Sequence, residues 1–264
     1  MQGAEYAAVR LGAQVLGALP PGLGQFRAAQ WYWHRRHPPH KLMRQRLAGG
    51  PSLWLDIGDR TQALAYMTRR YDHATVRRLL AYLPHDGMFF DVGANVGLIT
   101  CQVAHRRPDV RITAFEANPA AAKIWRRNAG FTGAVLVDAA VSAAPGTVSF
   151  AAPGHDLGAG RVVSDGFQVP AVTIDAYCAE HEIATIDVLK VDVEGSEPDV
   201  IAGAQGMLAS GSIRVAQLEA NDQLLVARGT SRGELIELMA ARGFRTHGRT
   251  DEADILFVHA RAGW

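Results

Sequence analysis

The twelve residues FFDVGANVGLIT, from Phe89 to Thr100, constrain the fold of this chain more than any other segment. Apolar residues run into Asp91, Gly93 and Gly97 follow with Asn95 between them, and an amphipathic run then begins. A strand that leads through a glycine turn into a helix is the usual first unit of a nucleotide-binding α/β sheet. The segment therefore predicts a strand, a tight turn and a helix, with a ligand held at the turn.

Strand-like and helix-like segments alternate through the rest of the chain. Strands are expected at 88–92, 111–116, 134–142, 186–193 and 213–219, and helices at 97–105, 119–128 and 232–241. This alternation predicts an α/β fold with a doubly wound, mostly parallel sheet. Two last β segments, 244–247 and 255–259, are joined by a short turn, so an antiparallel last strand is expected. Ser196 to Asp199 is typical of a capping box that begins a helix.

The first sixty residues have a different character from the rest. From residue 6 to residue 55 the sequence has no acidic residue, and Trp31, Tyr32 and Trp33 lie within this basic run. We therefore expect an N-terminal helical, basic and aromatic extension over 1–60 and the main domain over 61–264. The basic–aromatic segment Arg27–Arg46 either packs its aromatic residues on the main domain or contacts a membrane or lipid-linked substrate. Formation of a homodimer is a further role for the extension.

Composition excludes several classes of protein. The 264 residues carry a formal net charge of +1, which argues against a nucleic-acid partner bound by the whole surface. The cysteines, Cys101 and Cys178, lack metal-ligand spacing and are too few for a disulfide scaffold. No apolar run reaches the length of a membrane span, and the start lacks a good signal-peptide cleavage site. A cytoplasmic protein is expected, with membrane association through the extension as the alternative.

The turn itself indicates which ligand it holds. It lacks the third glycine of a dinucleotide fingerprint, and Asp91 would repel a pyrophosphate. S-adenosylmethionine fits better, because a carboxylate attracts its ammonium and sulfonium groups. Glu116 follows Gly97 by about the twenty residues expected before a ribose-binding acid. Asp138, with the adjoining Ala139, ends the third strand and is placed to reach the adenine.

Five phrases of the sequence together resemble the FkbM family of methyltransferases. They are DVGANVGLIT, FEANP, DAAVSAAPGTVSF, VTIDAY and IDVLKVDVEGSEPDVIAGA, and the resemblance covers roughly residues 65 to 221. It implies a class I methyltransferase (Rossmann-like) fold and methyl transfer from S-adenosylmethionine to a hydroxyl. The implied acceptors are sugars of glycans or glycolipids, or secondary metabolites. The implied cofactor residues are Asp72, Asp91, Gly93, Asn95, Gly97 and Glu116, with Asp72 standing where the family commonly has Glu.

Acidic residues at the ends of two later strands are the candidates for catalysis. Asp192 and Glu194 follow the fourth strand, and Glu219 ends the fifth. The proton of the acceptor hydroxyl can be removed by Asp192, Glu194 or Glu219. Asp192 also adjoins the methionine end of the cofactor. His155 is a further candidate base, in a glycine-rich loop that could cover the acceptor. Asp192, Glu219 and Asn221 also form a set of oxygen ligands suited to Mg²⁺ or Ca²⁺. The interpretation without a metal is favoured.

Two other functions stay open at this point. One is a catalytically silent module that binds S-adenosylmethionine and has lost turnover. The other is a methyltransferase of another acceptor class, such as nucleic acid or protein. The near-neutral charge and the absence of an N/D-P-P-Y/F motif beside the fourth strand argue against methylation of base amines.

Overall fold

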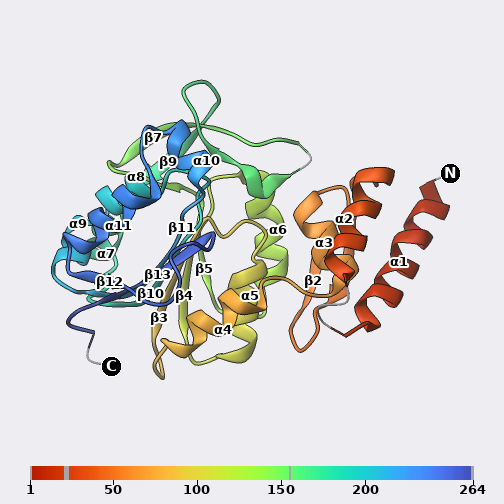
Figure 1. Cartoon of the computed structure of the whole chain (residues 1–264), viewed down its shortest axis with the longest axis horizontal. Helices are drawn as coiled ribbons and strands as arrows, with labels where there is room; N and C mark the ends of the chain where they lie inside the picture. The colour runs from red at the N-terminus through yellow and green to blue at the C-terminus, as the bar shows by residue number, and fades with distance from the viewer. Residues whose placement is uncertain (1, 21–23, 155, 263–264) are drawn as a thin grey trace.

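The structure, a computed structural model, describes residues 2–20, 24–154 and 156–262. Within these residues a seven-stranded sheet lies between two layers of helices, and a four-stranded sheet lies above one end of it (Figure 1). The strands of the main sheet are β3 (Met88–Val92), β4 (Arg111–Phe115), β5 (Val135–Val137), β10 (Ile186–Val191), β11 (Ile213–Glu219), β12 (Phe244–Thr246) and β13 (Asp254–His259).

The order of the main sheet is β12-β13-β11-β10-β3-β4-β5. The five strands from β11 to β5 are parallel, whereas β13 runs antiparallel to both β11 and β12. The predicted doubly wound, mostly parallel sheet with an antiparallel last strand is therefore confirmed. The strand order reverses between β3 and β10, and ligands bind at such a reversal, beyond the carboxyl ends of the strands.

Alternating side chains of the central strands form two cores on opposite faces of the sheet. Phe90 belongs to the core beneath α7 (Ile174–Glu180), α8 (Glu197–Ala202), α9 (Gln205–Ala209) and α11 (Arg232–Ala240). Phe89 faces α4 (His73–Ala81) and α5 (Leu98–Arg106). All six residues of β10 are buried, as expected for a strand in the middle of a parallel sheet. α6 (Pro119–Ala129) begins at Asn118, which accepts a hydrogen bond from Ala120 N.

The single strand expected over 134–142 is wrong, because the chain divides there between two sheets. β5 ends at Val137, and Ala139 donates its backbone N–H to Val137 O, which turns the chain out of the main sheet. β6 (Ala140–Val141) then joins the second sheet, whose order is β6-β9-β7-β8. The other strands of this sheet are β7 (Gly146–Ala151), β8 (Arg161–Val162) and β9 (Phe167–Val172).

The capping box predicted at Ser196 is also wrong. The Ser196 side chain makes no cap hydrogen bond and accepts one from Arg228 instead. Glu197 stabilises the preceding turn from inside, because its Oε1 accepts from Val193 N at 3.1 Å and from Gly195 N at 3.3 Å. This buried acid holds in place the turn that carries Glu194.

The N-terminal segment packs on the main domain as one continuous core. It contains α1 (Gln2–Ala18), α2 (Gln25–Arg36), the antiparallel pair β1 (Leu42–Arg46) and β2 (Ser52–Asp56), and it leads into α3 (Arg60–Thr68). The extension is therefore not wholly helical. Ala13 and Leu55 share a buried cluster with Leu64 and Trp125, so the expected boundary at residue 60 crosses a hydrophobic core. These elements form a lobe beside α5 and α6 (Figure 1).

The aromatic residues of the extension divide between core and surface. Trp33 is buried, whereas Trp31 is 68% exposed on the same helix. The packing interpretation thus holds for Trp33 and leaves Trp31 free to contact another surface. Among the described residues, no helix is both long and apolar enough to cross a membrane.

Candidate functional site

The predicted glycine turn lies at the reversal of strand order and requires its glycines. Gly93 has φ +76°, and a Cβ there would lie 1.8 Å from the carbonyl oxygen of Asp192. The backbone after β3 therefore lies directly against the backbone after β10, which only glycine allows. Gly97 has φ +84°, and a Cβ there would lie 3.0 Å from Trp125 Cδ1. The two glycines let the turn approach both the neighbouring strand and α6.

Asp91 lies behind this turn, fully buried, and not in a cavity wall. Its Oδ2 accepts a hydrogen bond from Thr100 Oγ1 at 2.6 Å, and its Oδ1 lies 3.1 Å from Lys190 Nζ. Lys190 also donates to Gly93 O at 3.0 Å and lies 3.5 Å from Asp192 Oδ2. The attraction to a cationic ligand that the sequence predicts for Asp91 is thus taken up by Lys190. The contact of Asp91 with the cofactor stays a prediction, and its observed contacts are with Thr100 and Lys190.

Lys190 is a site residue that sequence reasoning missed. Burial alone lowers the pKa of an ammonium, but the Asp91 and Asp192 carboxylates raise the pKa of Lys190 well above its usual range. The lysine therefore stays charged inside the protein. The available signal was a lysine in the middle of the apolar strand IDVLKV, because such a residue is rarely buried without a partner.

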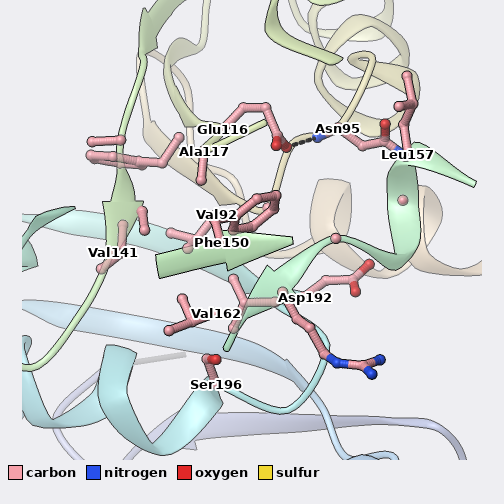
Figure 2. A pocket seen from close by; sticks show the side chains of 18 residues that line it. Val92, Asn95, Glu116, Ala117, Val141, Phe150, Leu157, Val162, Asp192 and Ser196 are labelled. Atoms are coloured by element: carbon pink, nitrogen blue, oxygen red, sulfur yellow. Dashed lines mark hydrogen bonds between the residues drawn. The ribbon is translucent and has the colours of Figure 1, made fainter. Parts of the chain in front are cut away.

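Glu116 lies at the end of β4 and faces the cavity beside the turn (Figure 2). Its Oε2 accepts from Asn95 N at 2.6 Å and its Oε1 from Asn118 N at 2.7 Å. Burial raises the pKa of Glu116 to about 7, against the opposing effects of these two hydrogen bonds and of Lys190. A carboxylate oxygen has more than one lone pair, so each oxygen can accept a further bond from a ligand hydroxyl.

The cavity in Figure 2 has a polar end and an apolar end. Glu116, Asn95 and Asp192 line the polar end, and Phe150 and Val162 of the second sheet lie across the apolar part. Ala139 lines this cavity as predicted.

Asp138 is not brought into the cavity. Its exposed side chain forms an ion pair with Arg126, because the chain turns outward between β5 and β6.

A second cavity of about 310 Å³ adjoins the first, and Gly93, Asn95 and Asp192 line both. Asp192, Glu194 and Glu219 face it, and one carboxylate oxygen of each lies within 4.8 Å of those of the other two. Burial and the neighbouring Asp192 raise the pKa of Glu194 to about 7. Burial, Asp192 and Glu194 raise the pKa of Glu219 to about 9. The predicted acids are thus brought together.

Asn221 lines the second cavity, and its role as a ligand stays a prediction. Its Oδ1 accepts from Gln223 N at 3.1 Å and so caps α10 (Asp222–Ala227). Glu194 lies in the cluster with Asp192 and Glu219. Among the described residues, Glu219 Oε2 is buried without a hydrogen-bond partner. Three such oxygen donors suit a hard divalent cation.

Asp72, a further predicted residue, is placed apart from the three acids. The Asp72 carboxylate accepts from Thr75 N at 3.1 Å and begins α4, so it lies outside the first two cavities and lines a third. His155 lies outside the described residues. Leu157, which lines the first cavity, donates its backbone N–H to Asp59 Oδ2 at 2.7 Å.

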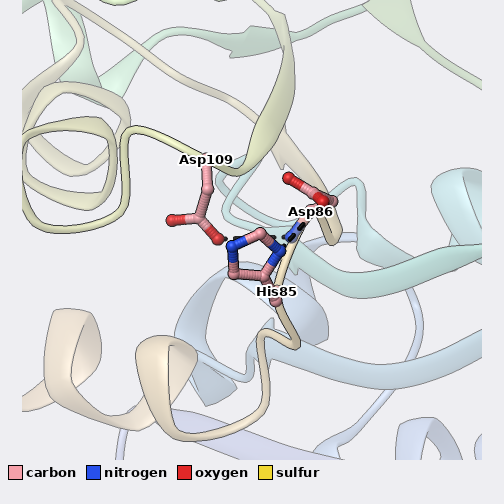
Figure 3. Close-up of side chains that lie close together, drawn as sticks. All are labelled: His85, Asp86 and Asp109. Carbon is pink, nitrogen blue, oxygen red and sulfur yellow. Dashed lines mark hydrogen bonds and ion pairs between the residues drawn. The ribbon is translucent and has the colours of Figure 1, made fainter.

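A separate cluster of His85, Asp86 and Asp109 (Figure 3) lies at the end of the sheet opposite to the glycine turn. These residues precede β3 and β4, so they stand at the amino ends of the strands. The Asp109 carboxylate is paired with Arg107: Arg107 Nε donates to Asp109 Oδ1 at 2.9 Å and Arg107 Nη2 donates to Asp109 Oδ2 at 2.6 Å. Those hydrogen bonds lower the pKa of Asp109 well below its usual range. This cluster is therefore satisfied by protein partners.

Comparison with known proteins adds to this geometry. The family described as "Methyltransferase FkbM domain" matches residues 91–246. The hexuronic acid methyltransferase AglP of Haloferax volcanii is 26% identical over 155 residues, which cover 57% of this chain and 64% of that protein. The 2-O-methyltransferase NoeI of Sinorhizobium fredii is 29% identical over 161 residues, covering 53% and 65%. The chain thus spans just under two thirds of the length of these curated relatives.

Solved structures show a more distant similarity. Precorrin-6y C5,15-methyltransferase of Geobacter metallireducens is 15% identical with a TM-score of 0.41, covering 70% of this chain and 84% of that one. A TehB-like methyltransferase of Corynebacterium glutamicum is 13% identical with a TM-score of 0.41, covering 72% and 89%.

Proposed function

The chain belongs to the FkbM family of methyltransferases, and on this premise we propose that it transfers a methyl group from S-adenosylmethionine to a sugar hydroxyl. Its mostly parallel, Rossmann-like sheet is the class I methyltransferase fold that the resemblance implied. The observation that carries the proposal is that the Glu116 cavity adjoins the cavity lined by the three acids, with Asp192 in the walls of both. The name of the hexuronic acid methyltransferase AglP supports a sugar as the acceptor, and that of the 2-O-methyltransferase NoeI supports transfer to oxygen.

The first cavity has a volume of about 50 Å³, so it must widen to admit a nucleoside, but its lining residues carry groups suited to that part of the cofactor. Glu116 retains lone pairs for ribose hydroxyls, and the buried Asn95 Oδ1 has no hydrogen-bond partner among the described residues. Phe150 and Val162 supply apolar surface for a flat base. The bound cofactor would supply a methyl group on a positively charged sulfur, and the neighbouring Asp192 carboxylate favours that charge.

The acids of the second cavity divide the proton chemistry between them. Glu194, with a pKa of about 7, is half deprotonated near neutral pH and is the residue to accept the proton of the acceptor hydroxyl. Glu219, with a pKa of about 9, keeps its proton and donates a hydrogen bond to an acceptor oxygen. Two carboxyl groups with separated pKa values commonly take such complementary roles. Lys190 holds Asp192 beside them.

A divalent metal at Asp192, Glu194 and Glu219 is the second candidate mechanism. The spacing of the three oxygens within 4.8 Å favours it, and the metal would then lower the pKa of the acceptor hydroxyl. Treatment with EDTA followed by Mg²⁺ separates the two mechanisms. If Glu194 acts as the base, methyl transfer survives EDTA; loss of transfer that Mg²⁺ restores would establish the metal mechanism.

The experiment that tests the function is calorimetric titration with S-adenosylhomocysteine, repeated with Glu116→Ala. We expect micromolar affinity in the wild type and loss of binding in the variant, because the removed carboxylate bonds both the turn and the ribose. Absence of binding to the wild type would overturn the methyltransferase proposal. Binding without methylation of any hydroxylated sugar would instead support a silent binding module.

A further inference from the structure

A third cavity, of about 640 Å³, lies between α2 and α3 and adjoins the acid-lined cavity. Arg60, Thr61 and Tyr71 line both, so a ligand that passes these side chains would enter the third cavity from the second. Leu64 and Ala65 provide apolar surface in the third cavity. An acceptor larger than one sugar unit therefore has a defined direction in which to extend from the acids.

The third cavity is lined by more basic than acidic side chains. Arg27, Arg60 and Arg70 line it, and the Asp72 carboxylate in its wall caps α4. Two of these three arginines already contact other side chains of the protein. Arg60 Nε lies 3.1 Å from Asp156 Oδ2, and Arg70 Nη1 donates to Gln25 Oε1 at 2.9 Å.

Each guanidinium has five N–H donors, so these contacts leave donors for a ligand. Arg27 is exposed on α2 and is the third of the set. Within the described part of the chain, the cavity therefore offers three guanidinium groups with N–H donors left for a ligand.

We propose that this arginine-lined cavity binds an anionic group of the acceptor, a carboxylate or a phosphate, and so directs methylation to acidic glycans. The planar guanidinium matches both anions through paired hydrogen bonds. The neighbouring cavity carries the carboxylate of Asp192 and, once it has lost its proton, that of Glu194, and these negative charges repel an anion. An acidic acceptor is therefore oriented with its anion at the arginines and a hydroxyl at the acids. This inference rests on the proposed function and names its substrate class.

The test measures binding of three small probes to the protein saturated with S-adenosylhomocysteine. Methyl β-D-glucuronide carries a carboxylate, glucose 1-phosphate a phosphate, and methyl β-D-glucoside neither. We expect at least one anionic probe to bind about tenfold more tightly than the glucoside, which corresponds to one charge-assisted contact. Whichever anionic probe binds more tightly identifies the carboxylate or the phosphate as the natural group.

Two matched substitutions test whether the arginine-lined cavity causes the preference for anionic probes. Arg27→Gln should remove most of the anion preference, whereas Arg35→Gln, an exposed arginine on the same helix outside the cavity, should retain it. Equal binding of all three probes, binding of none, or an equal effect of the two substitutions would overturn the inference. In each of these cases intact binding of S-adenosylhomocysteine leaves the methyltransferase proposal standing. Loss of S-adenosylhomocysteine binding in the wild type would instead refute the function itself.

Discussion

Lys190 Nζ lies 3.1 Å from Asp91 Oδ1, and both side chains are buried beneath the glycine turn. The same ammonium donates to Gly93 O and approaches Asp192, so one lysine joins the ends of β3 and β10. A buried ion pair leaves an uncompensated charge when one partner is removed. This relationship couples the stability of the sheet to the geometry of the cofactor turn.

Lys190→Met should therefore destabilise the protein by about 3 kcal/mol and weaken binding of S-adenosylhomocysteine. The physical reason is the lone Asp91 charge left behind the turn. Urea unfolding and calorimetry measure the two effects. Adding Asp91→Asn to this variant removes that charge and should recover part of the lost stability. A Lys190→Met protein as stable as the wild type would contradict the role assigned to the pair.

Glu116→Gln should lower the affinity for S-adenosylhomocysteine by about tenfold, because a neutral amide is a weaker acceptor for ribose hydroxyls. Asp138→Asn is the matched control, since its exposed carboxyl pairs with Arg126 outside the cavity. The control should leave the affinity unchanged. If Asp138→Asn weakens binding as much as Glu116→Gln, the contact with the adenine that the sequence predicts exists despite the outward turn.

The rate of methyl transfer should rise with pH through about 7, because Glu194 accepts a proton only after losing its own. Glu194→Gln should reduce kcat by about 100-fold with a smaller effect on KM, as expected for loss of a general base. A pH–rate profile of both proteins checks this. The role of Glu194 would be refuted by a variant that keeps both the rate and the rise near pH 7.

Glu219→Gln should stabilise the protein at high pH. The folded-state pKa of Glu219 is raised by burial and by Asp192, so the folded protein binds more protons than the unfolded chain between about pH 4.5 and 9. Stability must then fall as pH rises through this window. The variant should gain on the order of 2 kcal/mol over the wild type at pH 9 and lose that advantage near pH 4.5.

Thermal or urea unfolding at both pH values measures the effect, with the exposed Glu237→Gln as the control. A constant difference between wild type and Glu219→Gln at the two pH values would show that Glu219 titrates normally.

The extension is further proposed to contact an anionic membrane through the exposed part of Arg27–Arg46. Trp31 is largely exposed beside Arg35, a combination suited to an interface of lipid headgroups. Replacing Trp31 by Ser and Arg35 by Gln should reduce sedimentation with phosphatidylserine–phosphatidylcholine vesicles several-fold. The same pelleting of both proteins on these vesicles would exclude this surface.

The sequence by itself determined the α/β alternation, the glycine turn, the position of Glu116 beside that turn and the convergence of the acids. These follow from local pattern and from one topological rule: the carboxyl ends of parallel strands meet at one edge, so Asp192 and Glu219 had to be near neighbours. Such inferences need no knowledge of side-chain direction.

Only the tertiary structure decided which of these groups line a cavity. The pairing of Lys190 with Asp91 joins residues about a hundred positions apart, and no local pattern specifies such a contact. A single backbone hydrogen bond after Val137 turns Asp138 outward, and a helix cap occupies Asn221. The arginine-lined cavity arises where α2 packs on α3, far from the acids in sequence. Long-range packing sets these orientations, because it fixes side chains that local propensity leaves free.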